Sequence, residues 1–201
     1  MIIFIIGNIG SGKTICGVRE IVTSGNFPIV NFKLKGLKYH RLRFSDIITT
    51  VEDEKGKKTM SVNWDFWNDF KTKHKNFSIF LDEAHSIISS RNSHSKQNQL
   101  LSNWIAQIRK ILSDSMTNHI YIISQRIRRI DINFRELCHI VITCEKVEHK
   151  DKIYILLKYY DGVEGYENNS IKGKVLFSAN QYFKYYNTLE MVQFSDGGEY
   201  V

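Results

Sequence analysis

The chain has 201 residues, of which 42% are hydrophobic, so it is long enough to bury the core of one domain. Lysine and arginine total 28 against 21 aspartate and glutamate, and the net charge of +7 favours an anionic partner: nucleic acid, nucleotide or a membrane surface. Three cysteines without zinc-ligand spacing, no signal peptide and no apolar run near the roughly 20 residues that cross a bilayer exclude disulfide-rich secreted and membrane-spanning proteins. We therefore expect a cytoplasmic protein without a transmembrane segment.

The first expected elements are a strand over residues 1–6 and a helix over residues 13–23. MIIFII is a short, continuous and mostly β-branched run, which is typical of a strand buried on both faces. Between the two elements lies GNIGSGKT, from Gly7 to Thr14, which matches the phosphate-binding loop G-x-x-x-x-G-K-[ST] (Walker A). Because the motif lies between a strand and a helix, a purely structural glycine turn is the weaker alternative.

The chemistry of phosphate binding explains the residue types of this loop. Glycines let backbone amides approach phosphate oxygens without Cβ clashes, and the following helix offers its N-terminus to the charge. Lys13 is expected to reach the β- and γ-phosphates, and the Thr14 hydroxyl to ligate Mg²⁺. The sequence thus predicts ATP and Mg²⁺ as cofactors, with a nucleotide-binding set of Gly7, Asn8, Ile9, Gly10, Ser11, Gly12, Lys13 and Thr14.

A second motif follows a predicted strand over 28–34, a variable segment with a hairpin around EKGK, and a helix over 64–75. FSIFLDEAH places two acids at the end of a buried strand over 77–82, where ligands bind in a parallel sheet. Asp82 is expected to hold Mg²⁺ and Glu83 to polarise the attacking water (Walker B). The alternative is an ordinary strand end with solvated acids. DEAH is also a helicase label, but such helicases carry two motor domains, for which this chain is too short.

A third strand end comes after a predicted helix over 96–113. HIYIISQR predicts a strand over 119–124, after which Ser124 and Gln125 would face the γ-phosphate beside Glu83. A glutamine there senses phosphate or orients water without adding charge. The alternative is a polar cap that only ends the strand.

Basic residues gather in two segments, 29–45 and 86–130. Such a surface suits phosphate backbones that are bound without sequence preference, and the alternative is a solvated face that keeps the protein soluble. Within the second segment, SSRNSHSKQNQ is either a loop that grips DNA through Arg91 and Lys96 or a plain loop that leads into a helix.

The last elements are strands over 139–147 and 152–160, which flank EHKD and form an antiparallel hairpin, followed by an exposed loop at GYENNS. Strands that alternate with helices predict an α/β protein with the three-layer P-loop NTPase fold, a mostly parallel central sheet and an antiparallel edge hairpin. We expect a single P-loop ATPase domain over residues 1–201, in which residues 139–201 form the edge hairpin and a tail.

Walker A, Walker B and the third strand end resemble the FtsK/HerA superfamily of P-loop ATPases, and within it the viral genome-packaging and zonula-occludens-toxin-like branch. The stretches IVNFKLKG, WIAQIRKILSDSMTNHIYIISQR and GKVLFSANQYFKYYNT add to the likeness. The resemblance implies an ATP-hydrolysing motor that moves double-stranded DNA of any sequence in viral genome packaging or virion assembly. It also implies a homo-oligomeric ring and a capsid or membrane-embedded virion protein as a further partner. Toxin-like members often carry a membrane span and an outer domain, which we do not find in this sequence, so packaging is favoured over extrusion.

Catalysis in this superfamily also implies an arginine finger supplied by a neighbouring subunit, because no arginine lies inside Walker A. Arg109 is the first choice, since it lies on the helix that resembles the arginine-bearing helix of the family. Arg126, next to Gln125, is the second.

Two functions of other classes stay open. One is a nucleotide or small-molecule kinase, in which QRIRRIDINFRE would form an arginine-rich lid; the other is a nucleotide-gated switch that turns over slowly. The Asp82–Glu83 pair and the glutamine strand argue against a kinase, because a kinase must exclude attacking water. Phosphate release with and without DNA separates the three functions.

Overall fold

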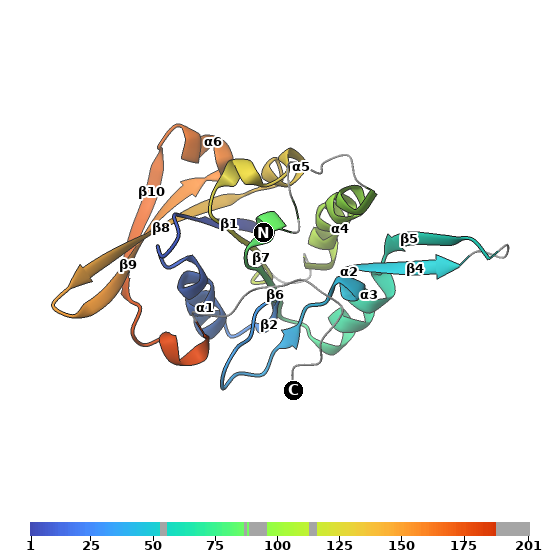
Figure 1. Ribbon diagram of the computed structural model, residues 1–201, viewed down its shortest axis with the longest axis horizontal. Helices are drawn as coiled ribbons and strands as arrows, with labels where there is room; N and C mark the ends of the chain where they lie inside the picture. Colours follow the sequence, from blue (N-terminus) through green and yellow to red (C-terminus); the bar gives the residue numbers. More distant parts are fainter. Residues whose placement is uncertain (53–55, 87, 89–95, 113–115, 188–201) are drawn as a thin grey trace.

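The computed structural model describes residues 1–187 except 53–55, 87, 89–95 and 113–115, and within one helix it leaves out the side chains of Gln97 and Arg109. Its main sheet has eight strands in the order β10-β9-β8-β1-β7-β6-β2-β3 (Figure 1). They are β1 (Ile2–Ile6), β2 (Phe27–Val30), β3 (His40–Arg41), β6 (Phe77–Leu81), β7 (Ile120–Ser124), β8 (Ile140–His149), β9 (Lys152–Asp161) and β10 (Ile171–Ser178).

The strands from β8 to β3 are parallel, whereas β9 runs antiparallel to both β8 and β10. A separate antiparallel pair, β4 (Ile48–Glu52) and β5 (Lys58–Val62), forms the hairpin that extends away from the body at the right of Figure 1. The expected α/β fold, with a mostly parallel sheet and an antiparallel hairpin of β8 and β9, is therefore confirmed. The hairpin around EKGK is also present.

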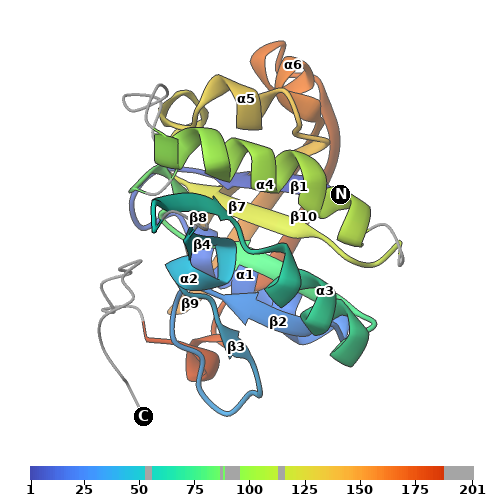
Figure 2. The ribbon, with the colours of Figure 1, turned by 90° about the vertical axis from the view of Figure 1, so that its right-hand side faces the viewer.

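Helices cover both faces of the sheet (Figure 1 and Figure 2). In Figure 1, α1 lies to the left of the central strands and α4 to the right. The helices are α1 (Lys13–Ser24), α2 (Phe44–Ile47), α3 (Trp64–Lys73), α4 (Lys96–Leu112), α5 (Ile132–Arg135) and α6 (Gly162–Glu167), with 3₁₀ turns η1 (Ala84–Ser86), η3 (Ile127–Arg129) and η4 (Phe183–Tyr185). Among the helices of the described ranges, none has the length and hydropathy needed to cross a bilayer.

Alternating side chains of β1 build two separate cores. Ile3 and Ile5 pack toward α1, while Phe4 faces α3, α4 and α5, so all five residues of β1 are buried. In the second core the rings of Trp67 and Trp104 lie 5.5 Å apart and are fully buried, which fixes α3 against α4. A strand covered on both faces has to be apolar throughout, which is why MIIFII shows no alternation.

Local residue chemistry sets the ends of the helices that flank the site. α1 begins directly after Gly12 and ends before Gly25, and both glycines have positive φ angles of 90° and 70°. α3 begins at an N-cap, because the side chain of Asn63 accepts a hydrogen bond from the amide of Phe66. The start of α1 therefore lies immediately beside the phosphate-binding loop.

Three expectations about the chain need correction. β2 ends at Val30 rather than at 34, because Asn31 turns its side chain toward the end of β6. GYENNS is an exposed loop only in part, since its first three residues complete α6. The tail contains a further strand, β10, which pairs with β9 and extends the hairpin at that edge of the sheet.

Candidate nucleotide site

The three sequence motifs follow neighbouring strands at one edge of the sheet. β7 lies between β1 and β6; its register pairs Ser124 with Ile6 and Ile122 with Leu81. The Walker A loop, Gln125 and Asp82 therefore leave the sheet at the same edge, where the carboxyl ends of the parallel strands meet. In open α/β sheets this edge is where ligands bind.

The loop after β1 has the geometry of an anion cradle. Gly10 and Gly12 have φ angles of 75° and 90°, and a Cβ atom on Gly12 would lie 2.3 Å from Cδ1 of Ile155 on β9. The ammonium of Lys13 donates to the carbonyl of Asn8 at 2.9 Å, which folds the lysine side chain back across the loop. A buried cation and positive-φ glycines fit a bound phosphate chain.

A buried hydroxyl in the same loop supports this fit. Among the described residues, Ser11 Oγ is buried and has no hydrogen-bond partner. An unsatisfied buried polar atom is costly, and a phosphate oxygen is an acceptor of the right kind. The residues present therefore fit a nucleoside triphosphate.

Two oxygen ligands for a cation face each other across the two motifs. Thr14 Oγ1 donates to Asp82 Oδ2 at 2.6 Å, and Asp82 Oδ1 accepts from the amide of Glu83 at 2.8 Å. Burial raises the pKa of the Asp82 carboxyl, and the hydrogen bonds from Thr14 and Glu83 oppose that rise. Within the described ranges no group of three or more His, Cys, Asp or Glu side chains is placed to hold a metal ion. One hydroxyl and one carboxylate suit Mg²⁺, which takes its other ligands from phosphates and water.

Asn31 is a site residue that sequence analysis missed. Its Oδ1 accepts from the Asp82 amide at 2.7 Å, and its Nδ2 donates to the Asp82 carbonyl at 2.8 Å. The side chain is 1% exposed and carries no charge, and its two hydrogen bonds fix the backbone of Asp82 at the end of β6. A lone asparagine within the apolar run IVNF was the signal that could have found it.

Glu83 lies in a strained turn. Its φ angle is 50°, a left-handed conformation that is uncommon for a residue with a side chain. Its Oε2 lies 3.2 Å from Nδ1 of His85, a pair that is ionic only when the histidine is protonated. The hydroxyl of Ser86 donates to the Glu83 carbonyl at 2.9 Å. The contact between His85 and Glu83, the residue expected to polarise the attacking water, has no signal in the sequence.

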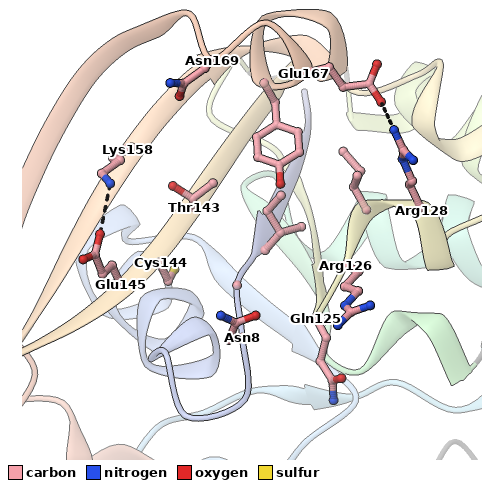
Figure 3. Close-up of a pocket in the computed structure, with 14 residues that line it drawn as sticks. Asn8, Gln125, Arg126, Arg128, Thr143, Cys144, Glu145, Lys158, Glu167 and Asn169 are labelled. Atoms are coloured by element: carbon pink, nitrogen blue, oxygen red, sulfur yellow. Dashed lines mark hydrogen bonds and ion pairs between the residues drawn. The ribbon is translucent and has the colours of Figure 1, made fainter.

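Gln125 lies next to the start of the phosphate loop. It lines a cavity of about 960 Å³ together with Gly7 and Asn8 (Figure 3). Its Oε1 accepts a hydrogen bond from Nη1 of Arg129 at 3.2 Å. Ser124, in contrast, is fully buried. Of the two polar residues at this strand end, Gln125 is thus the one that faces the nucleotide edge.

The end of the described chain also reaches this edge, through contacts that the sequence did not reveal. The Lys35 amide donates to the Tyr185 carbonyl at 2.7 Å, and Leu34 forms an antiparallel bridge with Tyr186. Burial and then the nearby charge of Asp82 raise the pKa of Tyr186 to about 12. The tail therefore packs beside the expected metal ligand.

The residues expected to bind DNA or to act in trans stay predictions. Arg91 lies outside the described residues, and so does the side chain of Arg109, whose backbone belongs to α4. Lys96 is exposed at the first position of α4, and Arg126 is exposed just after Gln125.

The fold and this edge together define a P-loop NTPase architecture: a parallel sheet, a phosphate loop between β1 and α1, and an acid pair after a neighbouring strand. The family model for zonular occludens toxin (Zot) matches residues 1–191. The chain therefore belongs to the zonular occludens toxin family. No curated protein matches it by sequence.

One solved structure supports the fold, and two others are similar at lower TM-scores. The N-terminal domain of zonular occludens toxin from Neisseria meningitidis is similar with a TM-score of 0.60 and 15% identity over 92% of this chain and 98% of that chain. The genome packaging NTPase B204 from Sulfolobus turreted icosahedral virus 2, in complex with ATP-gammaS, has a TM-score of 0.45 and 10% identity over 87% of this chain and 95% of that chain. The DNA-packaging ATPase B204 from Sulfolobus turreted icosahedral virus has a TM-score of 0.47 and 16% identity over the same shares. We base the shared fold on the Neisseria domain.

Proposed function

We propose that the protein is a Mg²⁺-dependent ATPase whose single domain spans residues 1–201. The observation that carries this proposal is the 2.6 Å hydrogen bond between Thr14 and Asp82, which joins the two motifs at the edge where Lys13 also lies. A hydroxyl and a carboxylate held this close form a preorganised pair for a cation bound to a nucleotide.

Each residue of the site has a role in this proposal. The loop amides, with Lys13, would bind and orient the triphosphate, and Thr14 and Asp82 would hold Mg²⁺, whose charge would offset that of the phosphates. Glu83 accepts a proton from the attacking water, and Gln125 orients that water toward the γ-phosphate. Arg109 of a neighbouring copy would add positive charge as the reaction proceeds.

The segment after Gln125 argues against the kinase alternative. A lid has to open and close over its acceptor, but Ile127, Ile130 and Phe134 are all buried in the core that α4 covers. Three buried anchors hold these residues as the short elements η3 and α5. ATP hydrolysis by water thus remains the reaction that the site supports best.

We further propose that hydrolysis moves duplex DNA in viral genome packaging or virion assembly, in the host cytoplasm and as a homo-oligomeric ring. Membership of the zonular occludens toxin family and the net charge of +7 support this proposal. Contacts to phosphate, through residues such as Arg91 and Lys96, suffice for a motor that must move any sequence. A capsid or membrane-embedded virion protein would be a further partner.

The test of the ATPase proposal uses two variants and one control. Lys13→Ala is expected to lose nucleotide binding, while Glu83→Gln keeps binding but loses phosphate release, because only water activation is removed. Glu52→Gln makes the same chemical change at the exposed end of β4, in the hairpin that extends away from the body, and is expected to leave turnover unchanged. Normal turnover by Glu83→Gln would show that the catalytic assignment is wrong.

The salt dependence of duplex binding tests the DNA proposal, and the mixing of two variant subunits tests the arginine finger between subunits. The affinity for duplex DNA is expected to fall as salt rises, with a slope of roughly 0.9 per phosphate contact on a log–log plot. Neutralising both Arg91 and Lys96 is expected to reduce this slope by about two. Mixing Arg109→Ala with Lys13→Ala subunits is expected to restore some turnover if the finger crosses an interface. Absence of both duplex binding at low salt and DNA-stimulated turnover would refute the motor.

A further inference from the structure

Three arginines follow Gln125 on one short turn. Ile127 and Ile130 are 5% and 0% exposed and anchor η3 in the core, so Arg126, Arg128 and Arg129 face outward. This turn leaves the sheet at the nucleotide edge, directly after the strand that lies between the two Walker strands. The exposed cations are therefore connected to the site by the shortest possible stretch of chain.

The contacts of Arg128 and Arg129 differ although the two are adjacent. Nη2 of Arg128 approaches Oε1 of Glu167 on α6 at 4.0 Å, and its side chain is 84% exposed (Figure 3). Arg129 turns the other way and donates from Nη1 to Oε1 of Gln125 at 3.2 Å. Only one of these two arginines thus contacts the residue expected to orient water.

A bond to Gln125 Oε1 restrains the very atom that catalysis needs. The amide can orient water by accepting one of its protons at Oε1, and the bond from Arg129 takes one of the two acceptor positions of that oxygen and fixes the direction of the side chain. A neutral amide is a weak acceptor for a guanidinium compared with an anionic phosphate, which forms a charge-assisted and often bidentate pair. A phosphate of a nucleic-acid backbone would therefore replace Gln125 as the hydrogen-bond acceptor of Arg129.

We propose that Arg129 is a positioning residue that couples DNA to hydrolysis. Without DNA it holds Gln125 away from the water-orienting position; a backbone phosphate of duplex DNA takes the guanidinium and releases the amide. This inference rests on the proposed function, because it needs both a DNA partner and ATP hydrolysis. It adds the regulation of that site by its partner.

The kinetic test compares Arg129→Ala with Arg128→Ala. Arg129→Ala is expected to raise turnover without DNA about three- to tenfold, the range set by the net contribution of one ordinary hydrogen bond, and to bring the DNA-stimulated ratio toward one. The KM for ATP is expected to stay unchanged, because the amide acts on water and not on nucleotide binding. Arg128→Ala, on the same turn but without contact to Gln125, is expected to keep both the basal rate and the stimulation.

A second measurement reads the contact without nucleotide. The side-chain amide resonance of Gln125, identified by its loss in Gln125→Asn, is expected to shift in Arg129→Ala and in the same direction when duplex DNA is added to the wild type. If duplex DNA stimulates the wild type and Arg129→Ala equally from the same basal rate, the coupling role is refuted and the motor stands. If DNA neither binds nor stimulates the wild type, the motor itself is refuted.

Discussion

Replacing Asn31 with alanine is expected to separate the stability of the sheet from the function of its nucleotide edge. The substitution removes two hydrogen bonds, of 2.7 and 2.8 Å, and leaves the backbone amide and carbonyl of Asp82 without their side-chain partner. Each buried group left unsatisfied costs about 1–3 kcal/mol, so the loss of both partners is expected to lower the free energy of unfolding by roughly 2–6 kcal/mol. Because Asp82 also loses its fixed position, the affinity for Mg²⁺-nucleotide is expected to fall as well.

The chain offers a matched control at the other end of β2, because Asn26 directly precedes this strand and Asn31 directly follows it. Asn26 is 7% exposed, and its Nδ2 donates to Ser78 Oγ at 2.9 Å and to the Thr117 carbonyl at 2.6 Å. Asn26→Ala is therefore expected to lower stability, by about 1–3 kcal/mol, without changing nucleotide affinity. Urea unfolding and titration of a fluorescent ATP analogue with Mg²⁺ measure the two effects. If Asn31→Ala and Asn26→Ala have the same affinity for Mg²⁺-nucleotide, either both unchanged from the wild type or both reduced, the role given to Asn31 is refuted.

Two further outcomes concern the site itself. Gly10→Ala is expected to cost about 1–2 kcal/mol from its positive φ alone, since its Cβ would meet open space, whereas Gly12→Ala adds a clash at 2.3 Å with Ile155 and is expected to cost more in urea unfolding. Burial raises the pKa of Asp82 in the folded protein, so its contribution to stability is complete at acidic pH and is lost as pH rises through the folded pKa. In EDTA, Asp82→Asn is therefore expected to be more stable than the wild type at neutral pH, with the gap closing on acidification; equal stability at every pH would contradict this cause.

Sequence reasoning succeeded where a motif needs its own local context. The loop from Gly7 to Thr14 requires a strand before it and a helix after it, and both are present as β1 and α1. The acids after β6 and the glutamine after β7 follow the same rule. Parallel strands bring such ends together at one edge, so the grouping of the motifs followed from the fold class.

Sequence patterns did not predict contacts between segments that lie far apart in the chain. Asn31 looked like part of a strand, because nothing local shows that its amide brackets the backbone of Asp82. β10 has a weak signal in the sequence, since most of its residues are exposed or half-buried and only Phe177 of this strand is buried. The hydrogen bond from Arg129 to Gln125 depends on the path of η3, which is set by the packing of Ile127 and Ile130 in the core. Local sequence does not show this packing.

The position of β1 in the sheet has a consequence for the folding of the nascent chain. Ile2 pairs with Ile120 and Ile3 with Ile140, so β1 has no partner strand until the segment around Ile120 has been made. At about 5–20 residues per second, synthesis leaves this wholly apolar strand unpaired for roughly 6–25 s. An apolar, β-prone segment in that state is a site for aggregation, and pairing at such long sequence separation is slow. The strand that carries the phosphate loop is therefore the part of the chain most in need of protection during synthesis.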